Sequence, residues 1–387
     1  MRALVVDQGL DRGSLAAVRA LRADGWAVGV GSPRPGLAGS SRAVDRWHFV
    51  PAAEDGVGGY LDAVGAAIDT GDYEIVFSAD DIGILALSLY RDELDAVVPY
   101  GPHETVLRAL DKLELTRAAE AVGLRAPRTE EAGETVTHLA GPLIVKARLH
   151  SILLPGAPGR LDTSIARTPR EANQAIAAIR SAGVEPILQE VVEGELMAFQ
   201  AVIDRGGKML GAVQQTSPRT WPPDAGSSAR SHTLALDERL ADHVAALLRR
   251  LGWFGLAQLQ FIAPRDGGAP RLIDLNGRFY GSLALAVASG SNLPGIWARL
   301  ATGRPLRSEG SARPGVEYQW LSRDLRDSWR REGPRGVLDA LRASTRSVHS
   351  VWSRDDPWPA VRHYGSQLAK AGSRRARSLR RRGATRG

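Results

Sequence analysis

The residues best suited to chemistry lie in two short apolar segments of the chain. Gln260 lies in LAQLQFIAP, and Asp274 and Asn276 lie in PRLIDLNGR. Alternate residues of a strand point to one face, so Asp274 and Asn276 share a face that Gln260 reaches across a predicted hairpin. Their oxygen atoms suit Mg²⁺, which takes few protein ligands and shares the phosphate oxygens of a nucleotide. Arg278, two residues further on, adds a cation for a transferred phosphate.

Two lysines extend this pattern towards an anionic ligand. Lys146 lies inside the apolar strand LIVKA, and Lys112 lies early in a predicted helix beside Asp111. A lysine buried in a strand needs an anion to compensate its charge. Each residue also has an ordinary interpretation, because a hairpin has a polar outer face and a lysine can face solvent. Residue type and spacing alone leave both interpretations open.

Composition excludes several other classes of function. The chain has 387 residues, of which 43% are hydrophobic and 24% are charged, so we expect two or three globular domains. It has no cysteine, which excludes disulfides, thiolate metal sites and a cysteine nucleophile. No apolar run reaches about 18 residues, and acidic residues interrupt the N-terminal segment early. We therefore expect a soluble, cytoplasmic protein.

The positive charge is concentrated at the C-terminal end. The formal net charge is +7, and residues 362–387 contain nine basic residues and no acidic ones. Removing these nine charges leaves −2, so the rest of the chain is nearly neutral. Residues 362–387 are predicted to be a disordered basic tail, which is either a solvated terminus or a contact to an anionic membrane surface. No specific nucleic-acid partner is expected, and a nucleic-acid-binding protein that acts through this tail is kept as an alternative.

The first hundred residues alternate short strand patterns with helical ones. RALVVD, WAVGVGS and EIVFSADD read as strands, separated by predicted helices, and this order predicts a parallel sheet. The loop at residues 8–14 and the pair Asp80-Asp81 follow strands, where such sheets bind ligands. The loop lacks the full GxGxxG spacing, so it does not predict a dinucleotide site. Asp80 and Asp81 either face a substrate or cap a helix.

The remaining elements are predicted as follows. A helix spans about residues 104–122, GPLIVKAR is a strand, residues 152–163 form a mobile loop, and a helix spans about residues 169–182. PILQEVVEG and LMAFQAVID are strands, and a polar loop then leads to the amphipathic helix LDERLADHVAALLRRLG. The hairpin turns at residues 265–268, and two helices close this part of the chain.

Four segments, in this order and spacing, resemble the ATP-grasp superfamily over about residues 1–305. ALDKLELTRAAEAVGLRAPRT is similar to the start of its ATP-binding region, and LIVKAR to its phosphate-binding lysine strand, which a lid follows. ILQEVVEGE is similar to its adenine hinge, and LQFIAP with PRLIDLNGRFYGSLALAVASG to its metal-binding strands. The resemblance implies an α/β ATP-grasp fold, in which a doubly wound Rossmann-like domain precedes two α+β subdomains that clasp ATP.

The resemblance also implies a division of the chain. The expected units are the pre-ATP-grasp domain at 1–103, subdomain A at 104–190 with a lid at 152–163, subdomain B at 191–305 with the metal and catalytic site, a C-terminal appendage at 306–361, and the tail at 362–387.

The roles implied by the resemblance are carried over residue by residue. Lys112 and Lys146 would hold the ATP phosphates; Gln189, Glu190, Val191 and Val192 would face adenine; Glu195 would reach the ribose; Gln260, Asp274 and Asn276 would bind Mg²⁺ or Mn²⁺; Arg278 would stabilise the transferred phosphoryl group; Arg219 would lie near the acyl phosphate; and residues 221–228 would shape the acceptor pocket.

Two positions depart from the usual family pattern. Many members have glutamate where this chain has Gln260, although the carbamoyl-phosphate-synthase-like branch resembles this chain in using glutamine. The usual Asn-Pro-Arg is Asn276-Gly277-Arg278 here, which keeps both functional side chains but loosens the backbone between them.

The resemblance implies an ATP-dependent ligase for a small-molecule carboxylate and an amine or similar nucleophile. Such an enzyme works through an acyl phosphate, releases ADP and phosphate, and is often a homodimer. The alternative is a nucleotide-binding protein with weak or no catalysis, in which Gln260 and Gly277 mark a decayed site. The sequence does not identify the acid or the amine.

Overall fold

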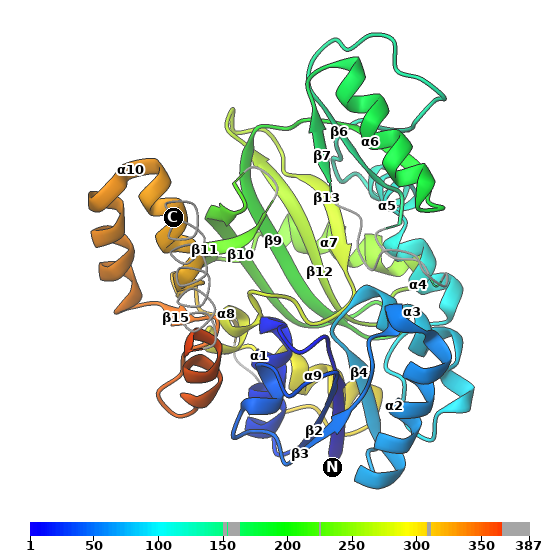
Figure 1. Ribbon diagram of the computed structural model, residues 1–387, viewed down its shortest axis with the longest axis vertical. Coiled ribbons are helices and arrows are strands. Elements are labelled where there is room, and N and C mark those ends of the chain that lie inside the picture. Colours follow the sequence, from blue (N-terminus) through cyan, green and yellow to red (C-terminus); the bar gives the residue numbers. More distant parts are fainter. Residues whose placement is uncertain (150–152, 154–162, 224–225, 308–310, 366–387) are drawn as a thin grey trace, which may run out of the picture.

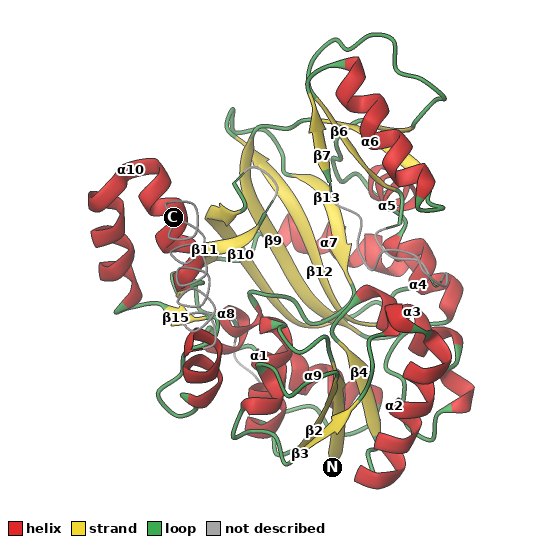
Figure 2. Ribbon diagram, in the orientation of Figure 1, coloured by secondary structure: helices red, strands yellow, loops and turns green. Residues whose placement is uncertain are grey.

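The computed structural model describes residues 1–149, 153, 163–223, 226–307 and 311–365. Its secondary structure forms three sheets, with long strands at the centre and helices around them (Figure 2). Most of the predicted lid at 152–163 and of the predicted tail at 362–387 lies outside the described residues. No helix in the described ranges is long and apolar enough to span a bilayer.

The N-terminal unit is built on a four-stranded sheet whose strands are all parallel, as predicted. The strand order is β3-β2-β1-β4. β3 was missed in the sequence because it is a short edge strand with largely exposed side chains. The elements are β1 (Arg2–Val6), α1 (Arg12–Ala23), β2 (Ala27–Ser32), β3 (Arg46–Phe49), α2 (Val57–Gly71), β4 (Ile75–Ser78) and α3 (Asp81–Leu89).

The single helix predicted over residues 104–122 is wrong, because two helices occupy this segment. They are α4 (His103–Leu110) and α5 (Lys112–Ala121). Asp111 between them is extended, with φ −74° and ψ 111°, and its side chain accepts hydrogen bonds from the backbone of Leu113 and Glu114. Asp111 is thus an N-cap that starts a new helix. Lys112 becomes the first residue of α5.

A second four-stranded sheet lies at the top of Figure 1, with α6 (Pro169–Ser181) packed against it. Its order is β5-β8-β6-β7, and its paired strands are antiparallel. A small apolar core that includes Val145, Ile176 and Leu188 joins helix and sheet. The strands are β5 (Thr129–Glu131), β6 (Leu143–Ala147), β7 (Ser164–Ala166) and β8 (Pro186–Glu190).

The largest sheet has seven strands in the order β13-β12-β9-β10-β11-β14-β15 and runs through the middle of the molecule (Figure 1). α7 (Glu238–Leu251) lies behind it in this view, and α8 (Leu283–Ala288) and α9 (Leu293–Ala301) follow the hairpin of β12 and β13 in the chain. The strands are β9 (Gly194–Ile203), β10 (Met209–Trp221), β11 (Ser227–Leu234), β12 (Gly255–Pro264), β13 (Arg271–Asn276), β14 (Glu317–Gln319) and β15 (Val348–His349).

The polar loop predicted after residue 208 is wrong, because β10 and β11 form a long antiparallel pair there. The inward side chains of this pair are polar but satisfy one another. The Ser217 hydroxyl lies 2.8 Å from those of both Ser228 and Ser231, and all three side chains are buried. The segment therefore lacks the apolar alternation that marks a half-buried strand.

Residues after 306 complete the central sheet and return to the N-terminal unit. β14 pairs with β11, and α10 (Leu321–Ser344) packs on β10 and β11. α10 bends at Gly333, whose φ is 60°, immediately before Pro334. Further on, Asp356 accepts hydrogen bonds from the Ser41 hydroxyl and from Arg19 of α1. The predicted appendage is thus bonded to two other parts of the protein.

Candidate functional site

The predicted hairpin of β12 and β13 is confirmed, and its register brings the predicted metal ligands together. Gln260 lies opposite Asp274, and Asn276 lies opposite Gln258, so the four side chains share one face. The Asn276 amide donates a hydrogen bond of 3.1 Å to Oε1 of Gln258. Gln258 was missed in the sequence, although it lies two residues before Gln260 in the same apolar strand.

Both predicted phosphate-binding lysines reach this hairpin from other elements. Nζ of Lys112, at the start of α5, lies 3.7 Å from Oδ1 of Asp274. Nζ of Lys146, on β6, donates a hydrogen bond of 3.2 Å to the carbonyl oxygen of Ile273. Only 3% of Lys112 and 6% of Lys146 is exposed. The structure therefore brings the two buried lysines, Lys112 and Lys146, together at the partly buried Asp274.

This group carries more positive than negative charge. Burial, followed by repulsion from Lys112, lowers the pKa of Lys146 to about 7, and Asp274 only partly counteracts this. The Lys112 ammonium group makes no hydrogen bond to any described residue. A buried ammonium group without a hydrogen-bond acceptor is costly, and a polyanion bound here would supply acceptors and compensating charge.

Arg278, just after β13, is held by the N-terminal unit. Its Nε lies 2.7 Å from Oδ1 of Asp81 and its Nη2 lies 3.1 Å from Oδ2. Burial alone would lower the pKa of Arg278, but the Asp81 carboxylate outweighs burial and raises it. Asp80 instead caps α3, because its Oδ1 accepts a 2.6 Å hydrogen bond from the Gly83 backbone. The helix-cap interpretation is thus confirmed for Asp80, whereas Asp81 contacts the candidate site.

Two further carboxyl groups are buried at the same end of the parallel sheet. Burial, reinforced by the charge of Asp11, raises the pKa of Asp7 to about 7. Burial likewise raises the pKa of Asp80 to about 6. Oδ1 of Asp7 accepts a 2.6 Å hydrogen bond from the Gly9 backbone, within the loop at residues 8–14. This sheet edge is therefore acidic and protonates near neutral pH.

The predicted adenine and ribose residues lie where β8 leads into β9. Gln189 is buried and donates a 2.8 Å hydrogen bond to the Thr129 hydroxyl, and Glu190 forms an ion pair with Arg271 of β13. Glu195 is exposed and accepts a 3.3 Å hydrogen bond from Thr216. Val191 and Val192 are half-buried in the short connection. Their roles towards a nucleotide stay predictions.

Arg219 is engaged by α10. Its guanidinium group donates to the Ser328 hydroxyl and lies 3.4 Å from Asp324 and 3.0 Å from Glu332. These contacts favour a structural role, and the predicted role near an acyl phosphate stays a prediction. The predicted acceptor loop at residues 221–228 includes residues 224–225, which lie outside the described residues.

Gln200 is a second buried amide that the sequence analysis missed. It lies on β9 opposite Gln258, so Gln200, Gln258 and Asn276 form one row across three strands. Gln200 is fully buried, and neither atom of its amide group has a hydrogen-bond partner in the described ranges. The available signal was a single glutamine inside the apolar run LMAFQAVID.

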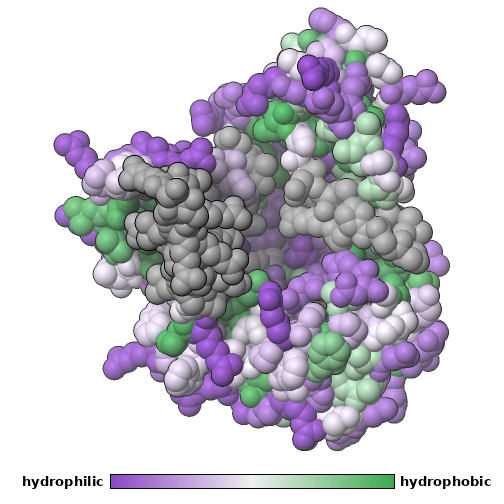
Figure 3. Space-filling model, viewed as in Figure 1, coloured by the Kyte–Doolittle hydropathy of each residue, from purple (hydrophilic) through white to green (hydrophobic). Residues whose placement is uncertain are grey.

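The donor atoms present suit a hard cation that is shared with phosphate oxygens. Across the part of the chain that the structure describes, no three His, Cys, Asp or Glu side chains are grouped to hold a metal. Gln260, Asp274 and Asn276 offer one carboxylate and two amide groups, all oxygen ligands that fit Mg²⁺ bound together with a nucleotide. In the space-filling view, the side of the molecule that faces the reader is hollowed near its centre, and the floor of this hollow is hydrophilic (Figure 3).

Comparisons with known proteins agree on the fold. Residues 186–324 match the sequence model of a family described as ATP-grasp in the biosynthetic pathway with Ter operon. A search of curated protein sequences returned no match.

Three solved structures illustrate the similarity. The L-amino acid ligase of Bacillus licheniformis is 16% identical, with a TM-score of 0.61 and coverage of 82% of this chain and 78% of that one. The biotin carboxylase of Campylobacter jejuni is 14% identical, with a TM-score of 0.60 and coverage of 81% and 74%. The biotin carboxylase domain dimer of the Hydrogenobacter thermophilus 2-oxoglutarate carboxylase, in complex with MgADP, ADP and bicarbonate, is 14% identical, with a TM-score of 0.60 and coverage of 81% and 73%. With its three sheets and its similarity to these structures over 81–82% of its length, the chain has the ATP-grasp fold, and residues 186–324 match an ATP-grasp family model.

Proposed function

We propose that the protein is an ATP-dependent ligase that joins a small carboxylate to an amine or similar nucleophile. The observation that carries this proposal is the group of two buried lysines around Asp274, which has an excess of positive charge. A bound triphosphate would supply the negative charge that compensates the two lysines. The names of the similar structures, an L-amino acid ligase and a biotin carboxylase in a beta-gamma-ATP complex, support the same class of reaction.

The proposed reaction has two balanced steps. A carboxylate oxygen of the substrate attacks the γ-phosphorus of ATP, the bond from that phosphorus to the β,γ-bridging oxygen breaks, and ADP leaves. The amine then attacks the acyl carbon, inorganic phosphate leaves with its bridging oxygen, and the amine loses a proton to solvent. No protein nucleophile is required, which fits a chain without cysteine.

The residues of the candidate site have the following roles in this reaction. Lys112 and Lys146 bind the phosphates, and Arg278, oriented by Asp81, stabilises the γ-phosphoryl group during transfer. Gln260, Asp274 and Asn276 would hold Mg²⁺, or Mn²⁺ in its place. The ion would neutralise phosphate charge. Gln189, Glu190, Val191 and Val192 are proposed to face adenine, and Glu195 the ribose.

The other parts of the proposal follow from the family. The units at 1–103, 104–190, 191–305 and 306–361 are proposed to fold as the pre-ATP-grasp domain, subdomains A and B, and the C-terminal segment. A homodimer is proposed by analogy with the domain dimer of the 2-oxoglutarate carboxylase.

The alternative, a nucleotide-binding protein with a decayed catalytic site, was based on Gln260 and Gly277. The structure gives a different reason for Gly277. Gly277 replaces the usual proline, but a Cβ atom at this position would lie 2.3 Å from the Trp253 ring. Trp253 is buried and donates a hydrogen bond to the carbonyl oxygen of Leu256. Gly277 is thus required by local packing rather than being a sign of decay.

The test is Mg²⁺-dependent ADP release by the purified full chain with pooled carboxylates and hydroxylamine as the nucleophile. Lys146→Ala is the control. We expect ADP and hydroxamate to appear together in the wild type and to vanish in the control. ADP without hydroxamate would contradict the acyl-phosphate step, and MgATP binding without ADP from any pool would favour the alternative.

A further inference from the structure

Arginine and tryptophan side chains alternate along a line from α1 to α10. The guanidinium carbon of Arg12 lies 3.5 Å from the ring centroid of Trp320, and that of Arg323 lies 5.2 Å from the same ring. Arg323 is also 5.9 Å from the Trp221 ring, and Arg330 is 6.0 Å from that ring. These five residues are called the arginine–tryptophan ladder below.

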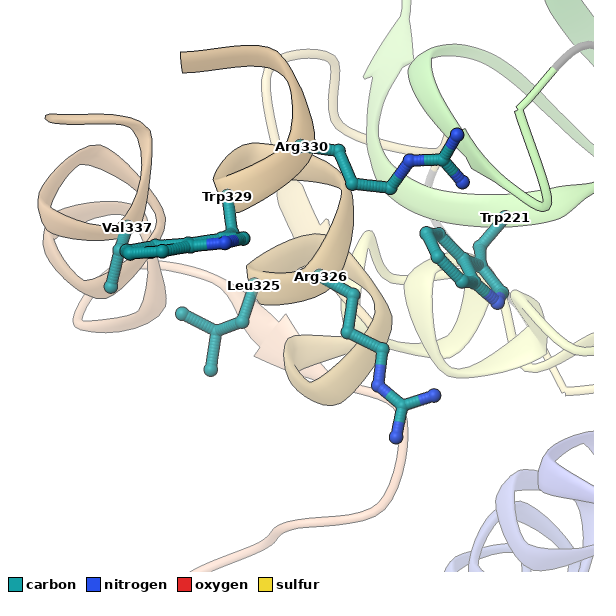
Figure 4. A pocket seen from close by; sticks show the side chains of 6 residues that line it. All are labelled: Trp221, Leu325, Arg326, Trp329, Arg330 and Val337. Atoms are coloured by element: carbon teal, nitrogen blue, oxygen red, sulfur yellow. The ribbon is translucent and has the colours of Figure 1, made fainter. Parts of the chain in front are cut away.

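An open pocket of 510 Å³ adjoins the α10 end of this ladder. Figure 4 shows that Arg326 and Arg330 extend from the side of α10 that faces Trp221. Leu325 and Trp329 extend from the other side of the same helix, where Val337 meets them from beyond the bend. The pocket therefore combines an aromatic wall, a cationic strip and an apolar strip.

Three arginines of this region have no compensating carboxylate among the described residues. Within the described ranges, none of Arg323, Arg326 and Arg330 forms an ion pair. Burial, reinforced by the charges of Arg326 and Arg12, lowers the pKa of Arg323. The positive charge of the ladder is left for a ligand.

The carboxylates of α10 are used elsewhere. Asp324 is buried and pairs with Arg219 and Arg230, and buried Asp327 pairs with Arg331. Asp11, next to Arg12 in the chain, caps α1. Asp324 thus faces β10 and β11, and Asp327 pairs within the helix, so neither carboxylate pairs with Arg323, Arg326 or Arg330.

The other end of the ladder lies beside the candidate catalytic segment. Nη1 of Arg12 donates a 2.8 Å hydrogen bond to the Tyr318 hydroxyl, which donates a 2.7 Å hydrogen bond to the carbonyl oxygen of Gly281. Gly281 is three residues after Arg278. A Cβ atom on residue 281 would lie 2.6 Å from Nη2 of Arg12, so a larger residue there would displace this guanidinium group.

We propose that the ladder and its pocket bind one of the ligase substrates, and that this substrate is an organic anion with a planar or apolar part. Guanidinium groups bind carboxylates and phosphates through paired hydrogen bonds, and tryptophan faces stack on planar groups. A pocket of this size suits a small molecule whose anionic group is fixed by a few polar side chains. This proposal rests on the proposed ligase function. It extends that function by naming the class of substrate.

The test is calorimetric binding of soluble aryl anions to the full chain, with MgADP in excess so that the nucleotide phosphate site is filled. Phenyl phosphate and phenylacetate distinguish a phosphate monoester from a carboxylate, while inorganic phosphate and benzyl alcohol each lack one half of the proposed ligand. We expect at least one aryl anion to bind about tenfold more tightly than either half-ligand.

Two double variants distinguish binding at this site from attraction by the net positive charge of the protein. Arg323→Gln with Arg326→Gln removes two arginines from the ladder and pocket, and Arg335→Gln with Arg342→Gln removes two exposed arginines of the same helix. We expect the first double variant to weaken aryl-anion binding about tenfold or more and the second to change it less than about twofold. Trp221→Leu removes an aromatic ring of the site without changing the charge of the protein. If its melting temperature is unchanged, weaker aryl-anion binding by this variant would support the same site.

Equal losses in both double variants would assign binding to net charge and overturn the proposal. No aryl-anion binding by the wild type would also overturn it, and binding only to phosphatidylserine vesicles would assign the surface to a membrane instead. MgATP binding and ADP release by the wild type are measured separately. Ladder-dependent binding without MgATP binding would contradict the ligase function alone, and ADP release without aryl-anion binding would contradict the ladder alone.

Discussion

Arg278 and Asp81 form an ion pair through two contacts, 2.7 Å and 3.1 Å long, although 197 residues separate them in the chain. Arg278 follows the hairpin that carries the candidate metal ligands, and Asp81 opens α3 of the N-terminal unit. Two contacts fix the plane of the guanidinium group as well as its position. The N-terminal unit thus orients the arginine assigned to the transferred phosphoryl group.

Substitution of this pair is expected to affect turnover more than nucleotide binding. Arg278→Lys keeps the charge but loses the paired geometry, so we expect kcat to fall about 100-fold, with the Kd for MgATP within about threefold. Asp81→Asn is expected to lower kcat about tenfold, because the guanidinium group loses its fixed orientation. Steady-state kinetics and equilibrium binding measure the two effects.

The double variant Arg278→Lys, Asp81→Asn provides the control for this pair. If Asp81 acts through Arg278, the second substitution should add little to the first. Fully additive losses in kcat would show that the two residues act independently.

Lys146→Met is expected to abolish MgATP binding while stabilising the ligand-free protein. Methionine has a similar length and removes a buried cation that Lys112 repels, so we expect the free energy of unfolding to rise by about 1 kcal/mol. Chemical denaturation and calorimetry measure the two quantities. Lower stability together with intact MgATP binding would contradict the assignment of Lys146.

Gln260→Glu is expected to raise the affinity of the site for Mg²⁺. A second carboxylate opposite Asp274 raises the negative charge available to the ion, so the Mg²⁺ concentration for half-maximal activity should fall about tenfold. Asp274→Asn should raise it instead. An unchanged Mg²⁺ dependence in both variants would place the ion elsewhere.

Asp7→Asn is expected to change how stability depends on pH. The pKa of Asp7 is about 7 in the folded protein against a reference value of 3.8, so folding favours the protonated form. The contribution of Asp7 is therefore complete below about pH 4 and is lost as the pH rises towards about 7. At pH 8 the variant should be more stable than the wild type by about 1–3 kcal/mol.

Denaturation curves at pH 5 and pH 8 test this expectation. Asp69→Asn, an exposed substitution with the same change in charge, serves as the control. Some dependence on pH should remain in Asp7→Asn, because Asp80 has a pKa of about 6 and loses its contribution over the lower part of the same range. A gain at pH 8 no larger than that of Asp69→Asn would contradict the assigned cause.

Arg219→Met is expected to destabilise the protein by about 1–3 kcal/mol, because Asp324 is fully buried and would lose one of the two arginines that compensate its charge. Arg219→Lys should recover part of this loss. If Arg219→Lys were fully stable but inactive, the predicted position of Arg219 near the acyl phosphate would gain support over its structural role.

The local patterns of the sequence predicted the hairpin and the lysine strand of the site correctly, whereas the helix that carries Lys112 was predicted wrongly. Alternation with a period of two, together with the turn at residues 265–268, predicted the hairpin that aligns Gln260 with Asp274. The alternation of strands and helices predicted the parallel N-terminal sheet. These features depend on neighbours within about ten residues, and backbone geometry and turn chemistry act at that range.

The tertiary structure alone decided which residues meet across the chain. The pairing of Arg278 with Asp81, the two lysines around Asp274 and the row from Gln200 to Asn276 join separate elements. The β10–β11 pair escaped prediction because its buried serines satisfy one another instead of alternating with apolar residues. Such contacts arise only when sheets and helices pack. A polar side chain inside an apolar segment indicates that a partner is needed, and the fold determines which one it receives.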